Sequence, residues 1–213
     1  MSERDVMEYD VAVIGAGPAG LAYAIRLKQI NPERMICVLE KGSEVGAHAL
    51  SGAVLEPGSL DELLPEWRQN PPAICVPAKD DVFLKLSKTG AMKLPTPPQQ
   101  NNHGNFIISQ GQLVKWMAEQ AEALEVDVFP GFAGAEALFG ENNEVIGVRV
   151  GDMGLESDGT PGAAYTAGVD IHAKLTVLAE GCRGSITKQL IKRYELDAGK
   201  SPQTYGLGFK ELW

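Results

Sequence analysis

A glycine turn between an apolar strand and a helix constrains this chain more than any other feature. Residues 11–14 read Val-Ala-Val-Ile and run directly into the turn Gly15-x-Gly17-x-x-Gly20, and a helical pattern continues over 18–29. The first glycine permits a tight turn out of the strand. The second lets the backbone approach a pyrophosphate, and the third lets the helix pack closely on the sheet.

The strand expected after this helix supplies a carboxylate. Residues 35–39 are apolar and end in Glu40, where an acid can accept hydrogen bonds from an adenosine ribose. The spacing exceeds the usual distance of about 20 residues because of a turn at 31–34. The helix begins at Pro18 and Ala19, and its first N–H groups and positive dipole end attract phosphates. Together these features favour a dinucleotide site over a purely structural glycine-rich turn.

Composition excludes several classes of function. The 213 residues carry a net charge of −9, which disfavours a nucleic-acid partner, and 44% are hydrophobic, which is enough for one core. Cys37, Cys75 and Cys182 form no C-x-x-C pair, so this chain alone should build neither a zinc site nor an iron–sulfur cluster, and no metal ligand is expected. The N-terminus carries acids and lacks a basic stretch, which predicts no targeting signal. The longest uncharged stretch, 11–25, is too short to span a bilayer.

Hydrophobic periodicity and turn residues place further elements along the chain. One of them, an acidic amphipathic helix, has Ser59 as its expected N-cap. In order, we expect a loop over 42–58, a helix over 59–67, a hairpin of 82–86 with 91–94, a loop over 95–102, a helix over 111–124, a strand over 126–129, a hairpin of 136–138 with 145–150, a glycine-rich surface segment over 151–168, strands over 169–173 and 175–179, a helix over 185–194 and the start of a strand over 205–213.

A second glycine turn follows the buried strand 175–179. It reads Glu180-Gly181-Cys182-Arg183. In two-motif flavoproteins such a strand closes over the adenosine side of FAD, and Arg183 is then well placed for phosphate oxygens. Taken alone, the segment could be only a core strand and turn. With the first motif it predicts an α/β fold, a Rossmann-like FAD-binding domain of the two-motif (GR2-type) class with an inserted β-rich region.

The predicted organisation is a single FAD-binding domain over residues 1–213, and we expect it to be incomplete. The pieces are a Rossmann core over 8–58, 106–135 and 169–195, an inserted segment over 59–105, a β-hairpin over 136–150 and the start of a substrate or quinone domain over 200–213.

Four segments make the chain resemble a known family, the electron transfer flavoprotein–ubiquinone oxidoreductases. They are residues 40–53, 116–124, 179–184 and 205–213. The resemblance implies an FAD site made of Gly15, Gly17, Pro18, Ala19, Gly20, Glu40, Lys41, Ser51, Gly52, Gln112, Ala133, Glu180, Gly181 and Arg183. It implies no acid–base or nucleophilic residue, because the cofactors carry the chemistry.

The resemblance also implies cofactors, partners and a location. Members of this family carry FAD and one 4Fe-4S cluster, accept electrons from reduced electron transfer flavoprotein and pass them to ubiquinone. The implied location is peripheral, on the cytoplasmic face of the bacterial inner membrane, or the mitochondrial inner membrane in eukaryotic relatives. The family's cluster cysteines are not in this chain, so we expect an N-terminal portion that is not active alone.

The hairpin segment 82–98 has a composition suited to a membrane surface. Between Asp81 and Glu119 there are lysines but no acidic residue, in a chain that is acidic overall. The hairpin also carries apolar residues, namely Phe83, Leu84, Leu86, Met92 and Leu94. Apolar residues flanked by lysines suit an anionic lipid surface. The alternative is an ordinary edge hairpin with solvated lysines.

Other functions remain open on the same fold. One alternative is a geranylgeranyl-reductase-like or aromatic-hydroxylase-like FAD enzyme, and another is a non-enzymatic binding protein of the GDP-dissociation-inhibitor kind. Four clustered cysteines further along the reading frame would favour the quinone reductase. Among the histidines, we expect His172 to be structural, assign nothing to His103, and leave open whether His48 lies near the flavin.

Overall fold

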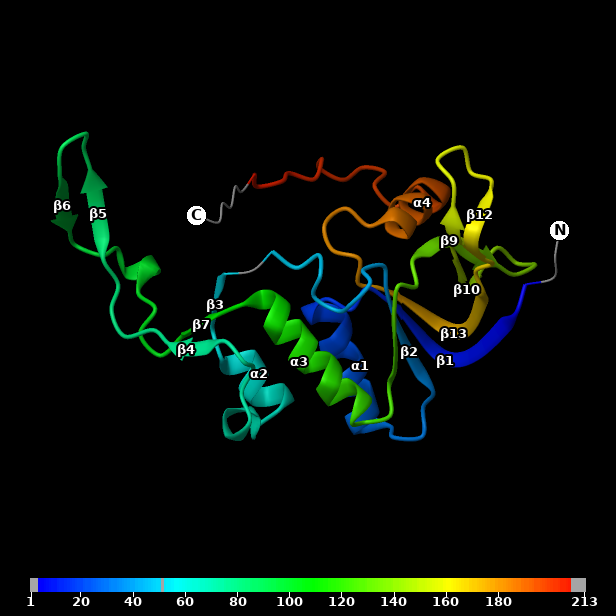
Figure 1. Cartoon of the computed structure of the whole chain (residues 1–213), viewed down its shortest axis with the longest axis horizontal. Helices are drawn as coiled ribbons and strands as arrows, with labels where there is room; N and C mark the ends of the chain where they lie inside the picture. The colour runs from blue at the N-terminus through cyan, green and yellow to red at the C-terminus, as the bar shows by residue number, and fades with distance from the viewer. Residues whose placement is uncertain (1–3, 51, 208–213) are drawn as a thin grey trace.

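The computed structural model describes residues 4–50 and 52–207, and a six-stranded mixed sheet forms its centre (Figure 1). Four parallel strands stand in the order β8-β2-β1-β13, which is the 3-2-1-4 order of a Rossmann fold, and β10 and β9 extend the sheet by antiparallel pairing. The predicted Rossmann-like α/β class is therefore confirmed. The sheet strands are β1 (Val6–Ile14), β2 (Ile36–Glu40), β8 (Asp127–Pro130), β9 (Gly134–Phe139), β10 (Val145–Val150) and β13 (Asp170–Leu178). The helices are α1 (Pro18–Ile30), α2 (Gly58–Leu63), α3 (Gln110–Glu122) and α4 (Ser185–Tyr194), with short 3₁₀ turns η1 (Trp67–Gln69) and η2 (Pro98–Gln100).

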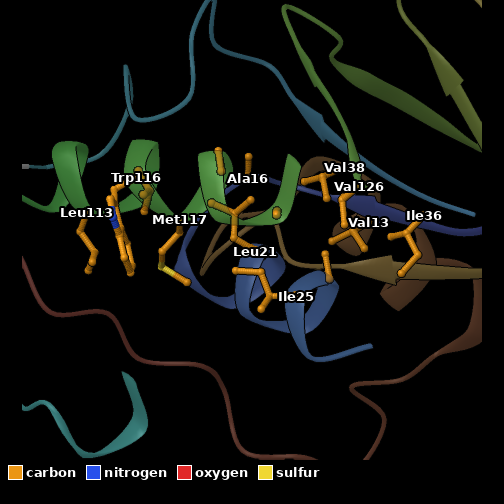
Figure 2. Packing of buried hydrophobic residues seen from close by; sticks show 14 of the residues in the cluster. Val13, Ala16, Leu21, Ile25, Ile36, Val38, Leu113, Trp116, Met117 and Val126 are labelled. Atoms are coloured by element: carbon orange, nitrogen blue, oxygen red, sulfur yellow. The ribbon is translucent and has the colours of Figure 1, made fainter. Parts of the chain in front are cut away.

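Both faces of the parallel strands are buried, because successive side chains of a strand point to opposite faces. Val13 and Val38 belong to a core shared with α1 and α3, which cover one face (Figure 2). Ala12 and Cys37 belong to a second core on the other face, where Ile186 of α4 packs with residues of β9 and β10. This two-sided burial explains why β1 and β2 read as continuous apolar runs in the sequence.

A second, three-stranded sheet joins segments that lie far apart in the sequence. Strands β3 (Ala53–Leu55) and β4 (Cys75–Pro77) both pair antiparallel with β7 (Phe106–Ile108). The expectation of an unbroken loop over 42–58 is wrong at β3. The strand forms because of its pairing with β7, and a local sequence pattern does not reveal a partner so far along the chain.

The acidic helix expected over 59–67 is shorter than predicted. Helix α2 ends at Leu63, and η1 follows it as a separate 3₁₀ turn. The N-cap position is Pro57, without a side-chain cap, so the assignment of Ser59 as N-cap is wrong. After the break between α2 and η1, Trp67 is buried, and its indole N–H donates to Asp61 Oδ1 at 2.6 Å.

Residues 78–105 form an arm that projects away from the body and carries the hairpin β5 (Phe83–Leu86) and β6 (Ala91–Leu94) at its far end (Figure 1). The hairpin lies where the sequence predicts it. Two contacts close the arm at its root. The Ala78 N–H donates to the Asn105 carbonyl at 2.9 Å, and the Asp81 carboxylate accepts the backbone and side-chain N–H groups of Asn102, each at 2.8 Å.

The C-terminal part differs from prediction in two places. Segment 151–168, for which the sequence predicts only a glycine-rich surface segment, contains an exposed hairpin, β11 (Met153–Leu155) with β12 (Pro161–Thr166). The two strands expected over 169–173 and 175–179 form one strand, β13, because the pairing with β1 continues across both. The strand expected over 205–213 lies largely outside the described residues, and its described part, 205–207, is not in a strand.

Asp10 ties β1 to its neighbours and yields a pH prediction. Its carboxylate accepts hydrogen bonds from Lys174 Nζ at 2.7 Å and the Met35 N–H at 3.1 Å, and Arg34 lies at 3.3 Å. These groups, Lys174 first, lower the pKa of Asp10 from 3.8 to about 2. A lowered pKa contributes stability that is fully present above the unfolded-state pKa and is lost as the pH falls toward the folded-state value. Asp10→Asn should therefore lower the Tm at neutral pH, and the difference should shrink between about pH 4 and pH 2. Thermal melts of both proteins across this pH range measure the difference in Tm, and a difference that stayed constant would contradict the prediction.

Candidate functional site

The candidate site lies at the carboxyl ends of β1 and β13, where the order of the parallel strands reverses direction. Ligands of open α/β sheets bind at this switch point. The two strands stay paired to their ends, since the Ala179 N–H donates to the Ile14 carbonyl at 2.8 Å. The first glycine turn leaves β1 here, and the Gly15 N–H donates to the Leu39 carbonyl of β2 at 2.8 Å. Both glycine turns therefore meet at one edge of the sheet.

The three motif glycines differ in what a side chain at each position would meet. Gly15 has a φ of +109°, and a Cβ there would lie 2.5 Å from the Ala179 carbonyl oxygen. A Cβ on Gly20 would lie 2.1 Å from the Gly15 carbonyl oxygen. A Cβ on Gly17 would meet no described atom within 4 Å. Protein packing therefore requires Gly15 and Gly20, whereas Gly17 borders open space at the N-terminus of α1. This space is where a pyrophosphate can reach the backbone, so the turn fits a dinucleotide.

Glu40 lies beside this turn, as its position at the end of β2 predicts. Its Oε2 accepts the Ala16 N–H at 3.2 Å, and its Oε1 accepts the Gly42 N–H at 2.7 Å. The side chain is 13% exposed. Two backbone N–H groups thus orient a carboxylate next to the glycine turn. A carboxylate held in this way can accept hydrogen bonds from ribose hydroxyls.

The carboxylate of Glu180 is used within the protein. It accepts the N–H groups of Ser185, Ile186 and Thr187 at 2.9, 3.2 and 2.8 Å, together with the Thr187 hydroxyl at 2.7 Å. These are the first residues of α4, so the side chain caps that helix. The Glu180 side chain therefore holds the second turn onto the start of α4.

The other residues of the second turn lie in the open. Gly181 has a φ of +78°, and a Cβ there would meet nothing described within 4 Å. The Arg183 guanidinium lies 5.0 Å from the ring centroid of Tyr205. The second turn thus resembles the first in presenting backbone to open space, with a cation nearby.

The remaining predicted site residues stay predictions. Lys41 and Ala133 follow the carboxyl ends of β2 and β8, at the same edge of the sheet as the glycine turns. The Ala133 carbonyl accepts the Gly151 N–H at 3.0 Å. Gly52 has a φ of +83°, and Ser51 lies outside the described residues. Within residues 4–50 and 52–207, no hydrogen bond joins any of these positions to the glycine turn.

Gln112 is exposed in the first turn of α3, next to a close backbone contact. A Cβ on Gly46 would lie 2.6 Å from the Gly111 carbonyl oxygen. The loop after β2 therefore packs directly on the start of α3. The cofactor contact expected of Gln112 stays a prediction.

Sequence reasoning missed Gly42 and the position of His48. His48 Nδ1 lies 3.8 Å from Glu40 Oε1, and a Cβ on Gly42 would lie 3.1 and 3.2 Å from these two atoms. His48 therefore lies beside the carboxylate expected at the ribose. The signal was a glycine two residues after the acid, which lets the chain fold back over it. His172 pairs with Glu8 at 3.6 Å on the neighbouring strand, consistent with a structural role.

The described residues contain few side chains grouped as metal ligands would be. Among residues 4–50 and 52–207, no cluster of three or more histidines, cysteines or carboxylates could hold a metal ion. Cys37 is buried, which raises its thiol pKa to about 12, while Cys182 is exposed at the second glycine turn. The described residues therefore do not supply a site for an iron–sulfur cluster.

Comparison with known proteins agrees with the geometry. Residues 13–67 match a family model described as an NAD(P)-binding Rossmann-like domain. The chain is 50% identical to the electron transfer flavoprotein-ubiquinone oxidoreductase of Pseudomonas aeruginosa and 46% identical to the mitochondrial protein of that name from Homo sapiens, over 99% of its length in both cases. It covers 40% and 35% of these relatives, so it spans well under half of their length. These matches confirm the resemblance noted in the sequence.

Solved structures extend the comparison to the fold. A geranylgeranyl bacteriochlorophyll reductase-like protein from Thermoplasma acidophilum aligns with a TM-score of 0.56 at 20% identity, over 82% of this chain and 39% of that one. A myxobacterial chondrochloren halogenase, described as a variant of FAD-dependent halogenases, aligns with a TM-score of 0.55 at 16% identity, over 86% and 39%. At these identities the likeness concerns the fold alone.

Proposed function

We propose that this chain is the FAD-binding region of an electron transfer flavoprotein–ubiquinone oxidoreductase. The observation that carries the proposal is the identity of 46–50% over 99% of the chain to proteins of that name. The convergence of two glycine turns and Glu40 at the switch point supports it. The structural alternatives, a reductase or an aromatic hydroxylase of the same fold, share only the fold at about 20% identity.

The chain's own residues have defined tasks in this proposal. Gly17 and the first N–H groups of α1 bind the pyrophosphate, and Glu40 accepts the ribose hydroxyls. Gly15 and Gly20 keep α1 close to the sheet, and Glu180 holds the second turn to the start of α4. When bound, FAD supplies the capacity to accept and release electrons one at a time. The protein positions it and excludes other orientations, and no side chain needs to act as an acid or base.

For the whole protein, we propose electron transfer from reduced electron transfer flavoprotein to ubiquinone at a membrane. The relatives' names support both partners. The described residues contain no ligand set for the family's 4Fe-4S cluster. The proposed location is peripheral, on the cytoplasmic face of a bacterial inner membrane. Among the described residues, no helix is long and apolar enough to cross a bilayer.

We further propose that the arm docks this protein on lipid. The hairpin β5–β6 stands away from the body (Figure 1). Most of its large apolar residues are exposed, including Leu84 at 45% and Leu86 at 73%. Lysines accompany them, and no acidic residue intervenes between Asp81 and Glu119. Apolar side chains with flanking cations favour attachment to an anionic membrane surface.

Activity of the intact protein tests the proposed function. Purified protein should show flavin absorbance and should reduce a soluble ubiquinone analogue when supplied with reduced electron transfer flavoprotein. NADPH should not replace this donor. A protein that retains flavin but oxidises NADPH and ignores the flavoprotein donor would favour the reductase or hydroxylase alternative. A colourless protein would contradict flavin binding itself.

A further inference from the structure

We propose that His48, in its protonated form, favours the binding of FAD through its positive charge, so that the affinity for FAD rises as the pH falls from about 8 to about 6. The proposal rests on the FAD site proposed above and adds a residue to it. Three observations carry it: the fixed position of the loop that bears His48, the distance of the imidazole from Glu40, and the charges around the ring.

The loop after β2 holds His48 close to the first glycine turn. The Gly42 carbonyl accepts the Gly131 N–H at 2.7 Å, which ties the start of the loop to the end of β8. A Cβ on Gly46 would lie 2.6 Å from a carbonyl oxygen at the start of α3, so the middle of the loop packs on that helix. The Ala49 N–H then donates to the Gly46 carbonyl at 3.0 Å, which closes a turn around His48. Contacts on both sides therefore fix where the imidazole lies.

The Glu40 carboxylate lies next to both the imidazole and the glycine turn. Glu40 Oε1 lies 3.8 Å from His48 Nδ1, and Glu40 Oε2 accepts the Ala16 N–H at 3.2 Å. Ala16 precedes Gly17, whose backbone borders the space open to a pyrophosphate. A separation of 3.8 Å is too long for a hydrogen bond but suits an ion pair. The free lone pairs of the carboxylate therefore stay available to ribose hydroxyls while His48 contributes charge.

The imidazole is exposed where a bound cofactor can cover it. The His48 side chain is 61% exposed, whereas the Glu40 side chain is 13% exposed. A diphosphate on the first glycine turn adds negative charge near a ring that already lies beside a carboxylate. Opposite charges nearby stabilise the protonated form of histidine, which ordinarily changes its charge between about pH 5 and pH 8. Binding of the diphosphate and protonation of His48 should therefore favour each other.

The other charged groups around the imidazole ordinarily keep their charge near neutral pH. The loop itself carries Lys41 and Glu44, and from α3 the Lys115 ammonium lies 3.7 Å from the Glu44 carboxylate. The start of α1, over residues 18–25, and the end of β8 with the residues after it, 128–135, carry no charged side chain. Lysines and carboxylates ordinarily titrate well outside the range from about pH 6 to about pH 8. A pH dependence of FAD binding in this range therefore reports on the imidazole.

Flavin titrations of the apo form of the intact protein at about pH 6 and about pH 8 test the proposal. The FAD dissociation constant of the unsubstituted protein should be at least about threefold lower at the lower pH. His48→Gln keeps a polar side chain without the charge, and its affinity should be the same at both pH values to within about 1.3-fold. His48→Lys carries a persistent charge, so at about pH 8 it should bind FAD as tightly as the unsubstituted protein does at about pH 6.

His172→Gln is the matched control. This histidine pairs with Glu8 and lies about 20 Å along β13 from the carboxyl end of the strand, where the site is. Its side chain is 38% exposed, so the substitution should leave the fold intact. The variant should keep the pH dependence of the unsubstituted protein in full.

The other outcomes separate the role of His48 from the proposed function. An FAD affinity that is high but independent of pH would overturn the role of His48 and leave the FAD site in place. An affinity that falls toward about pH 6, with His48→Gln insensitive to pH, would also overturn it, because the imidazolium would then compete with the ribose for Glu40. An equal pH dependence in His48→Gln and in the unsubstituted protein would assign the effect to another group. Failure to bind FAD at either pH would overturn the FAD site and, with it, the role of His48.

Discussion

A Gly17→Ala variant of the intact protein should fold as stably as the unsubstituted protein and yet lose FAD. Gly17 has a φ of −78°, which alanine adopts freely, and its Cβ would meet no described atom within 4 Å. The added methyl group therefore disturbs only a ligand that approaches the backbone there. We expect the free energy of unfolding of the apoprotein to change by no more than about 1 kcal/mol, the difference between glycine and alanine at an N-cap. FAD affinity should fall at least about 100-fold, and flavin titration with fluorescence detection measures it.

Gly20→Ala is the matched control, because its Cβ would collide with protein rather than ligand. The atom would lie 2.1 Å from the Gly15 carbonyl oxygen and 3.1 Å from both Ala179 Cβ and Val13 Cγ1. The backbone of the turn or of α1 must then move, at a cost of about 3 kcal/mol. This variant should lose stability and FAD together. If Gly17→Ala binds FAD normally, the pyrophosphate does not lie on this turn, and the assignment of the site fails.

Glu180→Ala should destabilise the protein and weaken FAD binding, because the Glu180 side chain caps α4 and thereby holds the second glycine turn. The substitution removes the acceptor for three N–H groups and a hydroxyl at the start of α4. Loss of such a cap costs about 2 kcal/mol, which lowers the Tm of a domain of this size by roughly 4–8 °C. Because the same side chain fixes the second glycine turn, FAD affinity should fall about tenfold.

A conservative variant and a remote one separate this positioning role from a general loss of stability. Glu180→Gln keeps an acceptor oxygen and should recover part of both effects, whereas Glu141→Ala, at an exposed position in the β9–β10 turn, should change neither. Thermal melts of the apoprotein and flavin titrations of each variant provide the measurements. A Glu180→Ala protein with reduced Tm and undiminished FAD affinity would show that the capped turn has no part in the site.

The nucleotide half of the site was readable from sequence because its requirements are local. Gly15 needs a positive φ and Gly20 needs a close approach, and both constraints arise within a few residues of the turn. Glu40 ends a strand that must lie next to β1, so the topology of a βαβ unit brings it to the turn. The glycine motif also placed α1, hydrophobic periodicity placed α3, and turn residues helped to place the β5–β6 hairpin.

The parts that could not be read depend on contacts distant in sequence. Strand β3 exists because it pairs with β7, and nothing in the glycine-rich segment around it indicates that partner. The β11–β12 hairpin is exposed, so it lacks the apolar alternation that marks a strand. Glu180 was assigned to the cofactor because it stands in the second glycine motif. Its use as a helix cap depends on the fold of the turn, which brings the Ser185 N–H to the Glu180 carboxylate.

The bond between Ala78 and Asn105 at the root of the arm has an evolutionary consequence. The chain departs from the nucleotide domain and returns to it at adjacent points, so the excursion between them is a module. The entropy of closing such a loop grows only slowly with its length, so residues can be gained or lost in the module at little cost to the fold. On the proposal that the arm docks on lipid, selection can therefore adjust the strength of that attachment while the residues of the two glycine turns stay unchanged.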